Sequence, residues 1–220
     1  MNFLESVLKY LFPPICGMCG QIGVYLCPKC KRQIEYSNLF LNQNKDYTNN
    51  YERYFDYHYY LFSYTGLIRE KIIQYKFYNQ PYLADMFSEF FVKNEKLCGF
   101  LKNYDIIVPV PISRQRVAMR GYNQSELIVG KMSKSQGIKS EKNVLVKIKE
   151  NKTQSLLDKT QRIENVKNVY KIQNGQKIKE KNILLFDDIY TTGSTANECA
   201  KVLKYAGASS VGILTIAKDF

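Results

Sequence analysis

The sequence predicts an α/β domain with a mainly parallel sheet flanked by helices, preceded by a small module that holds four cysteines. The first observation is that short runs rich in Ile, Leu and Val alternate with amphipathic helical patterns in the C-terminal half. Such strands are buried on both faces, as parallel strands are. The second is size and composition: 220 residues, 45% of them hydrophobic, suffice for one ordinary domain and one small module.

The formal net charge is +12, from 32 Lys and Arg against 20 Asp and Glu. A polyanionic partner is reasonable at this charge, although scattered Lys residues more often solvate a surface. The charge alone does not choose between DNA, RNA and a phosphorylated metabolite. No apolar run approaches the roughly 20 residues that span a bilayer, so we expect no membrane span and a cytoplasmic protein.

Residues 2–12 carry apolar side chains at helical spacing, and Pro13 and Pro14 end the pattern. We therefore expect a short amphipathic helix. Our preferred interpretation is that it packs on its own protein, with a membrane surface or a partner helix as alternatives. The apolar positions are Phe3, Leu4, Val7, Leu8 and Leu11.

Two Cys-x-x-Cys pairs follow this helix, separated by seven residues. This spacing lets four thiolates gather around one tetrahedral ion, and Gly17, Gly20 and Gly23 are expected to permit the tight turns. So small a segment has too little apolar surface to fold without metal, and four sulfur ligands leave no position for a catalytic water. We interpret the module as structural zinc, with an unliganded redox pair as the alternative. The expected ligands are Cys16, Cys19, Cys27 and Cys30.

Three regions are expected along the chain. The helix and zinc module take residues 1–36, and the polar stretch 37–50 lacks periodicity and predicts a linker. The α/β domain takes residues 51–220. Its expected elements are, in order, strand 57–64, a helix opened by Gly66, a helix after Pro81, strand 105–110, helix 123–135, strand 144–148, strand 183–186, helix 194–205 and strand 210–216.

The first two helices of the domain each have a predicted buried face, read from their apolar spacing. In the helix after Gly66 that face holds Leu67, Ile68, Ile72 and Tyr75. In the helix after Pro81 it holds Leu83, Met86, Phe87, Phe90 and Phe91.

The strongest functional motif follows strand 183–186. Asp187 and Asp188 come at its carboxyl end, where open α/β sheets bind ligands. The next residues are small, hydroxylated or glycine and lead into a helix N-terminus, which offers N–H groups and hydroxyls to a phosphate. The predicted phosphate-binding residues are Thr191, Thr192, Gly193, Ser194 and Thr195.

The motif excludes two common nucleotide sites. It lacks the Lys of a nucleoside-triphosphate P-loop and the glycine spacing of a dinucleotide site. A ligand with a terminal phosphate and a vicinal diol fits, because its hydroxyls can donate to Asp187 and Asp188 while the following turn holds the phosphate.

Residues 186–195, FDDIYTTGST, resemble the phosphoribosyl-pyrophosphate (PRPP) signature of type I phosphoribosyltransferases. With the four-cysteine module and further stretches, the chain resembles the ComF family, the ComFC-type proteins of DNA competence. The resemblance covers nearly the whole chain. The further stretches are Tyr64 to Arg69 with Lys76, VPVPISR at 108–114 with RGYNQ at 120–124, and Thr153, Gln154, Leu157, Arg162 and Asn165.

The resemblance implies a type I phosphoribosyltransferase fold with an N-terminal zinc ribbon. It also implies a role in bringing single-stranded DNA into the cytoplasm alongside a ComFA-type helicase. The ribose hydroxyls of PRPP would lie on Asp187 and Asp188, the 5-phosphate on 191–195, and the Mg²⁺-chelated pyrophosphate beside the loop 110–114. The candidates for pyrophosphate contact, each also open to interpretation as a solvated charge, are Arg114, Arg116, Arg120 and, more weakly, Lys76.

Three interpretations stay open at this point. The leading one is a PRPP-site protein of DNA uptake that binds single strands. The second is an active, Mg²⁺-dependent phosphoribosyltransferase that releases pyrophosphate, with Asp187 and Asp188 as candidates for a catalytic role. The third is a zinc-dependent scaffold with a vestigial PRPP site. We assign no catalytic residue, because a fold does not settle catalysis and no acceptor-binding element is evident.

The remaining residues of interest have ordinary structural interpretations. Tyrosines lie beside basic residues at 51–54 and 75–78, an arrangement that suits the binding of single-stranded DNA. Our preferred interpretation is that these tyrosines pack in the core or lie on an ordinary surface. The lone His58 is expected to be structural, and Cys98 and Cys199 to be ordinary buried thiols.

Overall fold

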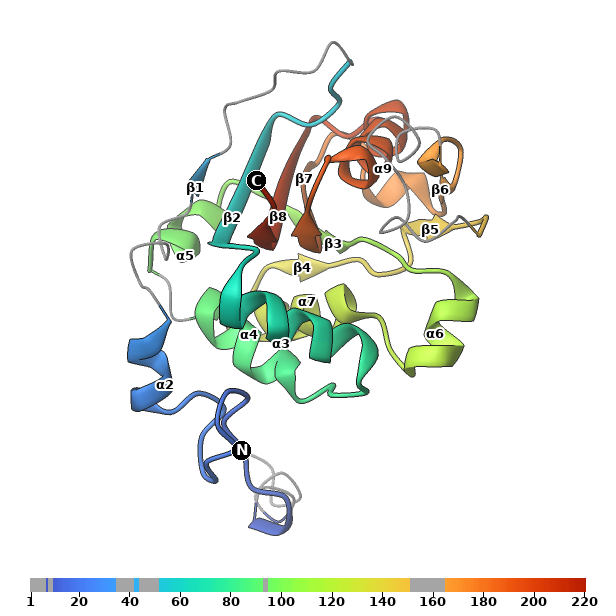
Figure 1. Ribbon diagram of the computed structural model, residues 1–220. Coiled ribbons are helices and arrows are strands. Elements are labelled where there is room, and N and C mark those ends of the chain that lie inside the picture. Colours follow the sequence, from blue (N-terminus) through green and yellow to red (C-terminus); the bar gives the residue numbers. More distant parts are fainter. Residues whose placement is uncertain (1–6, 8–9, 35–41, 44–51, 93–94, 151–164) are drawn as a thin grey trace.

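The computed structural model describes residues 7, 10–34, 42–43, 52–92, 95–150 and 165–220 (Figure 1). Its main sheet has the strand order β1-β2-β8-β7-β3-β4. All neighbours pair in parallel except β1, which pairs antiparallel with β2 at the edge. The strands are β1 (Asn42–Gln43), β2 (Tyr57–Ser63), β3 (Ile106–Pro109), β4 (Lys139–Ser140), β7 (Asn182–Tyr190) and β8 (Ser210–Lys218). The predicted class, a mainly parallel sheet flanked by helices, is confirmed.

Helices cover both faces of this sheet, with α3, α4 and α7 on one side and α9 on the other (Figure 1). Along β7, Leu184 and Phe186 pack against the first group, while Ile183 and Leu185 pack against α9. Successive side chains of a strand point to opposite faces, and here both faces are covered by helices. The sequence of β7 is therefore apolar at successive positions rather than at every second one. The helices are α2 (Pro28–Gln33), α3 (Gly66–Phe77), α4 (Leu83–Val92), α5 (Glu95–Leu101), α6 (Arg114–Arg120), α7 (Gln124–Gln136), α9 (Ser194–Tyr205) and the 3-10 turn η3 (Gly175–Lys177).

The predicted buried face of α4 is confirmed at all five positions, and that of α3 is wrong at one. Leu67 is 37% exposed, and Lys71 is buried in its place. The Lys71 Nζ donates to Gln74 Oε1 at 3.1 Å. The long aliphatic stem of a lysine can therefore cover apolar surface while its ammonium group keeps a polar partner.

The predicted strand 144–148 exists but lies outside the main sheet. It forms β5 (Leu145–Lys147), which pairs antiparallel with β6 (Tyr170–Ile172) in a separate two-stranded sheet. Only residues 141–144 separate β4 from β5. A parallel return to the main sheet needs a crossover of about a dozen residues, so this connection is too short.

Two N-terminal predictions are partly tested. Val7, Tyr10 and Leu11 are helical as expected, and Val7 and Leu11 are 37% and 62% exposed. Phe3, Leu4 and Leu8 lie outside the described residues. The linker predicted at 37–50 contains the short strand β1, and its other residues also lie outside. Among the described helices, none is long and apolar enough to cross a membrane.

His58 is fully buried in β2, in agreement with a structural role. Its Nε2 lies 3.0 Å from Thr215 Oγ1, and its ring stacks on Tyr190 with 3.8 Å between centroids. Burial, and secondarily the positive charge of Lys218, lower the pKa of His58 to about 3. The imidazole is thus neutral in the folded protein at any physiological pH.

The buried histidine should make the protein acid-sensitive. In the unfolded chain the pKa of His58 is about 6.5, so the unfolded state binds an extra proton below that pH and the free energy of unfolding falls as pH drops toward 3. Between pH 6.5 and 5 the loss should be about 2 kcal/mol. His58→Phe, which keeps a ring against Tyr190, should remove this part of the slope in denaturant titrations at several pH values. Identical slopes in both proteins would contradict the assignment.

Candidate functional site

The acidic pair lies near the carboxyl end of β7, at the edge of the parallel sheet where the sequence predicts it. The strand runs to Tyr190 rather than ending at 186, because pairing with β8 continues as far as Tyr190 and Lys218. The two side chains point to different partners: Asp188 lies beside Lys76 of α3, whereas Asp187 lies beside Ser125 at the start of α7. Each acid therefore has different neighbours.

Asp188 is buried and forms an ion pair with Lys76. The Lys76 Nζ, in the last turn of α3, lies 2.8 Å from Asp188 Oδ1. Removing either partner would leave the other charge largely buried without compensation, which is costly. Lys76, the weaker of the predicted pyrophosphate contacts, thus contacts the acidic pair in this structure.

Asp187 is partly buried, and its carboxylate accepts hydrogen bonds. Its Oδ1 accepts from the backbone N–H of Asp188 at 2.9 Å and lies 3.5 Å from the Ser125 Oγ. Burial, together with the charge of Asp188, raises the pKa of Asp187 to about 7, against the lowering effect of Lys76. At neutral pH this carboxyl is therefore poised between its protonated and ionised forms.

The turn after β7 is built from a glycine and two hydroxyl side chains that contact each other. Gly193 has φ +76°, and a Cβ at this position would collide with the Tyr190 hydroxyl, so the turn requires glycine on both counts. The Thr192 Oγ1 lies 3.0 Å from the Ser194 Oγ and 3.4 Å from the Ser194 backbone N. Ser194 then begins α9, whose first amides and positive dipole end face the same turn.

The three predicted arginines occupy a helix that the sequence analysis missed. Ser113 caps α6 by accepting from the Arg116 N–H at 3.3 Å, and Gly121, with φ 78°, ends it. Arg114 is exposed, while Arg116 and Arg120 are half-buried. The loop expected to continue through 114 instead turns directly into this helix.

Arg120 is held close to the acidic pair. Its Nη1 donates to Gln124 Oε1 at 3.2 Å, and its guanidinium lies 5.0 Å from the centroid of the Phe77 ring. Burial and the neighbouring charge of Arg116 lower the pKa of Arg120, while Asp188 raises it. Arg116 and Arg120 thus add positive charge near Asp188.

The β5–β6 hairpin adds a site residue that sequence reasoning missed. Lys147 is half-buried, with its Nζ 5.9 Å from the Tyr170 ring centroid. Burial and then Arg116 lower the pKa of Lys147 to about 8, while Asp187 acts in the opposite direction. Lys147 therefore lies among the charges of this site, although no local signal in strand 144–148 indicates it. Thr153, Gln154, Leu157 and Arg162 lie outside the described residues.

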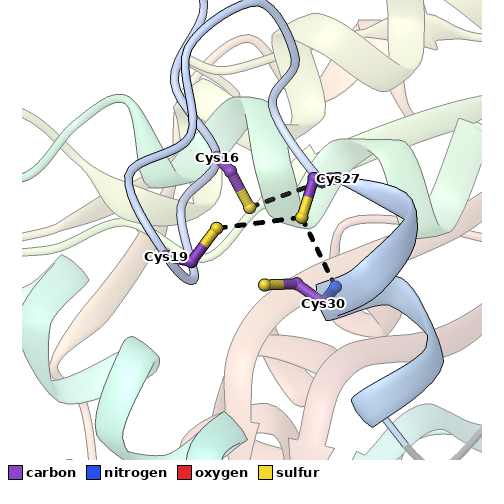
Figure 2. A group of neighbouring side chains, drawn as sticks. All are labelled: Cys16, Cys19, Cys27 and Cys30. Carbon is purple, nitrogen blue, oxygen red and sulfur yellow. Dashed lines mark hydrogen bonds between the residues drawn. The ribbon is translucent and has the colours of Figure 1, made fainter.

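The four cysteines converge as their spacing predicts (Figure 2). Their sulfur atoms all lie within 4.8 Å of one another and could hold a metal ion. Backbone amides point at the sulfurs: Cys27 N–H donates to Cys16 Sγ at 3.3 Å, and Cys30 N–H to Cys27 Sγ at 3.4 Å. Cys27 also caps α2, which positions Cys30 one turn later.

The module's glycines serve two purposes. Gly20 and Gly23 have φ of 79° and 103°, as expected for tight turns. Glycine is required at position 17 for a different reason: a Cβ there would lie 2.7 Å from a Leu83 side-chain atom and 2.8 Å from a Met86 side-chain atom, both in α4. The cysteine module therefore docks closely on α4, and Cys16, Leu26, Cys27 and Cys30 join the same apolar cluster as that helix.

The other two cysteines are not part of this group. Cys199 is fully buried in α9, as expected of an ordinary buried thiol, and burial raises its pKa well above the usual value. Cys98 is only half-buried, with its Sγ 3.7 Å from the Val92 carbonyl oxygen.

No family model matches the chain, but individual proteins do. It is 30% identical to Competence protein F of Haemophilus influenzae over 67% of this chain and 66% of that protein. It is 26% identical to Competence protein ComFC of Bacillus subtilis over 98% of this chain and 82% of that protein. Identity to Competence protein ComFC of Streptococcus pneumoniae is 32%, over 72% and 66% of the two chains. The chain thus spans about two thirds of the Haemophilus and Streptococcus proteins.

Among solved structures, the chain is similar to glutamine PRPP amidotransferase from B. subtilis complexed with ADP and GMP. The TM-score is 0.43 at 15% identity, over 65% of this chain and 30% of that one. A structure described as the allosteric regulatory enzyme of purine biosynthesis matches with a TM-score of 0.38 at 17% identity, over 65% and 29% of the chains.

The raised pKa of Asp187 predicts a stability cost at neutral pH. The folded state holds this proton up to about pH 7, whereas the unfolded chain releases it near 3.8, so the free energy of unfolding falls as pH rises through this window. Asp187→Asn, which keeps the acceptor for the Asp188 N–H, should stabilise the protein by about 1 kcal/mol or more at pH 8 and change little at pH 4. Urea titrations at both pH values test this, and equal effects at both would contradict it.

Proposed function

The chain belongs to the ComF family of competence proteins, and we propose that it binds PRPP at the carboxyl edge of its sheet while acting in the uptake of single-stranded DNA. One observation carries the PRPP proposal. Asp187 and Asp188 lie at the carboxyl end of β7, directly before a glycine-containing turn that enters the N-terminus of α9.

The ribose of PRPP would lie on the two acids. Its two ring hydroxyls donate hydrogen bonds, and an ionised carboxylate has no proton of its own, so both of its oxygens can accept them. Lys76 holds Asp188 in place for one of them at 2.8 Å. Asp187, with its pKa near 7, would lose its proton when a hydroxyl donor arrives, so ligand binding should draw this carboxyl fully into its ionised form. The 5-phosphate would occupy the turn from Thr191 to Thr195.

The pyrophosphate would lie among the cations that surround the acidic pair. The charge of Arg116 lowers the pKa of both Arg120 and Lys147, so the three residues share one region of positive charge. Crowded cations favour a highly charged anion, which relieves their mutual repulsion. Arg114, exposed at the start of α6, is the weakest of the predicted contacts.

Magnesium fits this donor set, since the carboxylate oxygens of Asp187 and Asp188 are the hard ligands that it prefers. When bound with PRPP it would neutralise charge on the pyrophosphate. The protein's own residues orient the ligand: the acids hold the ribose, the turn holds the phosphate, and the cations hold the leaving group.

The DNA part of the proposal follows from the relatives. Three of them are named as competence proteins, and the chain has a net charge of +12. We include in the proposal a cytoplasmic location and a ComFA-type helicase as partner. Reduced, clustered thiols suit that compartment.

We propose further that the four cysteines hold structural Zn²⁺. Four sulfur atoms within 4.8 Å of one another fit the closed tetrahedral set of structural zinc sites. The close contact of Gly17 with Leu83 and Met86 means that the zinc module would also support α4. Loss of zinc should therefore destabilise the packing of α4 as well as the module itself.

The PRPP proposal predicts an affinity that depends on the acidic pair. In calorimetric titrations of PRPP with Mg²⁺, Asp187→Asn with Asp188→Asn should weaken binding at least about tenfold, because both ribose contacts lose their charge. Asp219→Asn, an exposed acid near the C-terminus, serves as the matched control. An unchanged dissociation constant in the double variant would refute the site. No binding by the unsubstituted protein would favour the vestigial-site interpretation.

The zinc proposal predicts one zinc per chain in native, reduced protein. Cys16→Ser should abolish metal binding and lower the melting temperature of the whole domain, because the module packs on α4. Cys98→Ser, a half-buried thiol outside the cluster, should leave both unchanged. Elemental analysis and calorimetry measure the two quantities. A metal content near zero, or unfolding that is insensitive to Cys16→Ser, would refute the proposal.

A further inference from the structure

A pocket opens at the opposite edge of the sheet from the acidic pair. It has a volume of about 510 Å³ and is lined by residues at the amino ends of three neighbouring strands: Tyr57 of β2, Asn182 of β7 and Ser210 of β8. The arrowheads of β7 and β8 point away from this edge (Figure 1). A ligand here would therefore be separated from the proposed PRPP site by the length of the strands.

One wall of the pocket is a series of aromatic rings. The ring of Phe100 lies 4.2 Å from that of Tyr59 and 5.0 Å from that of Tyr104, while Tyr57 and Tyr59 are 6.0 Å apart between centroids. Gly212 of β8 makes room for this wall, because a Cβ there would collide with the Tyr104 hydroxyl. Tyr57 is 47% exposed, so an aromatic face is open to solvent at the mouth.

The other wall is polar but carries little net charge. Asn182 Oδ1 accepts from the Ser210 hydroxyl at 2.7 Å, and Asn103 presents an exposed amide beside it. The one carboxylate among the lining residues, Asp56, is already engaged. Its Oδ2 accepts from the Val211 N–H at 2.8 Å and lies 3.2 Å from the Lys204 Nζ.

Basic and aromatic side chains continue from the pocket along the end of α9. Lys204, the partner of Asp56, is followed by Tyr205, which is 72% exposed. The Lys201 Nζ lies 5.7 Å from the ring centroids of both Tyr205 and Tyr54. This surface, which we call the α9 end patch, therefore consists of Tyr54, Lys201, Lys204 and Tyr205.

This combination matches the way proteins hold single-stranded nucleic acids. Bases stack on aromatic rings, amide groups read their polar edges, and lysines follow the phosphates. A small phosphorylated metabolite without a ring would leave the aromatic wall without a stacking partner. The volume is also in the range of small-ligand sites, roughly 300–1,000 Å³, and so admits a base with its sugar.

We propose that this pocket receives a base of single-stranded DNA, while a neighbouring phosphate contacts Lys201 of the α9 end patch. The inference rests on the DNA part of the proposed function and adds to it a surface distinct from the PRPP site. One consequence is that both ligands can be bound at once, since they occupy opposite edges of the sheet.

The test uses oligothymidylate with one 2-aminopurine, whose fluorescence is quenched when it stacks. The zinc-loaded protein should bind this probe with quenching, and Tyr57→Ala should weaken binding about fivefold or more and reduce the quenching. Lys201→Ala should weaken binding without removing the quenching and should lower the salt dependence. Tyr82→Ala, an exposed tyrosine at the start of α4, is the matched control.

The outcomes separate this inference from the proposed function. Binding that is equal in Tyr57→Ala and Tyr82→Ala would overturn the pocket assignment while leaving a DNA-binding protein. No binding of the probe by the unsubstituted protein would overturn both the pocket and the DNA part of the proposal. PRPP titration of the same preparations reports on the carboxyl edge independently, and Tyr57→Ala should leave it unchanged.

Discussion

The alternation of side chains along β7 controls both the packing and the chemistry of this protein. Up to Phe186 the strand directs apolar residues to both faces, and each face is covered by helices. Beyond Phe186 the strand places Asp188 against Lys76 of α3 and Asp187 beside Ser125 of α7. The two adjacent carboxylates thus have different surroundings, because successive side chains of a strand point in opposite directions.

This difference has an energetic consequence. Asp188 has a cation at 2.8 Å, which offsets the loss of its hydration. Asp187 is left with hydrogen-bond donors and a neighbouring negative charge, so its pKa rises to about 7. A carboxyl of this kind lowers stability when it ionises, and binding sites commonly accept such a cost for function. Arg120 and Lys147 lie close enough to the pair for the charges of Asp188 and Asp187 to affect their pKa values. The proposed ligand, with both hydroxyls and phosphates, would suit such a mixture of acids and cations.

The sequence could predict what depends on local patterns. The aromatic and apolar runs predicted β2, β3, β7 and β8, and residues 187–195 predicted an acidic pair near the end of a strand followed by a glycine-containing turn into a helix. Packing between segments that are distant in the sequence could not be predicted from local patterns. No local pattern indicates that the charge of Asp187 acts on Lys147, because β5 and β6 form their hairpin outside the main sheet. Gly17 resembles a turn glycine, yet the structure requires it because α4 lies against it.

The most direct test of the account is the ionisation of Asp187 itself. Its side-chain carbon can be followed by NMR across a pH titration, with Asp187→Asn identifying the signal, in the absence and presence of PRPP with Mg²⁺. The account predicts a midpoint near pH 7 in the free protein and a clear shift to lower pH when the ligand is bound. A midpoint near 4 in the free protein, or one that the ligand does not move, would contradict it.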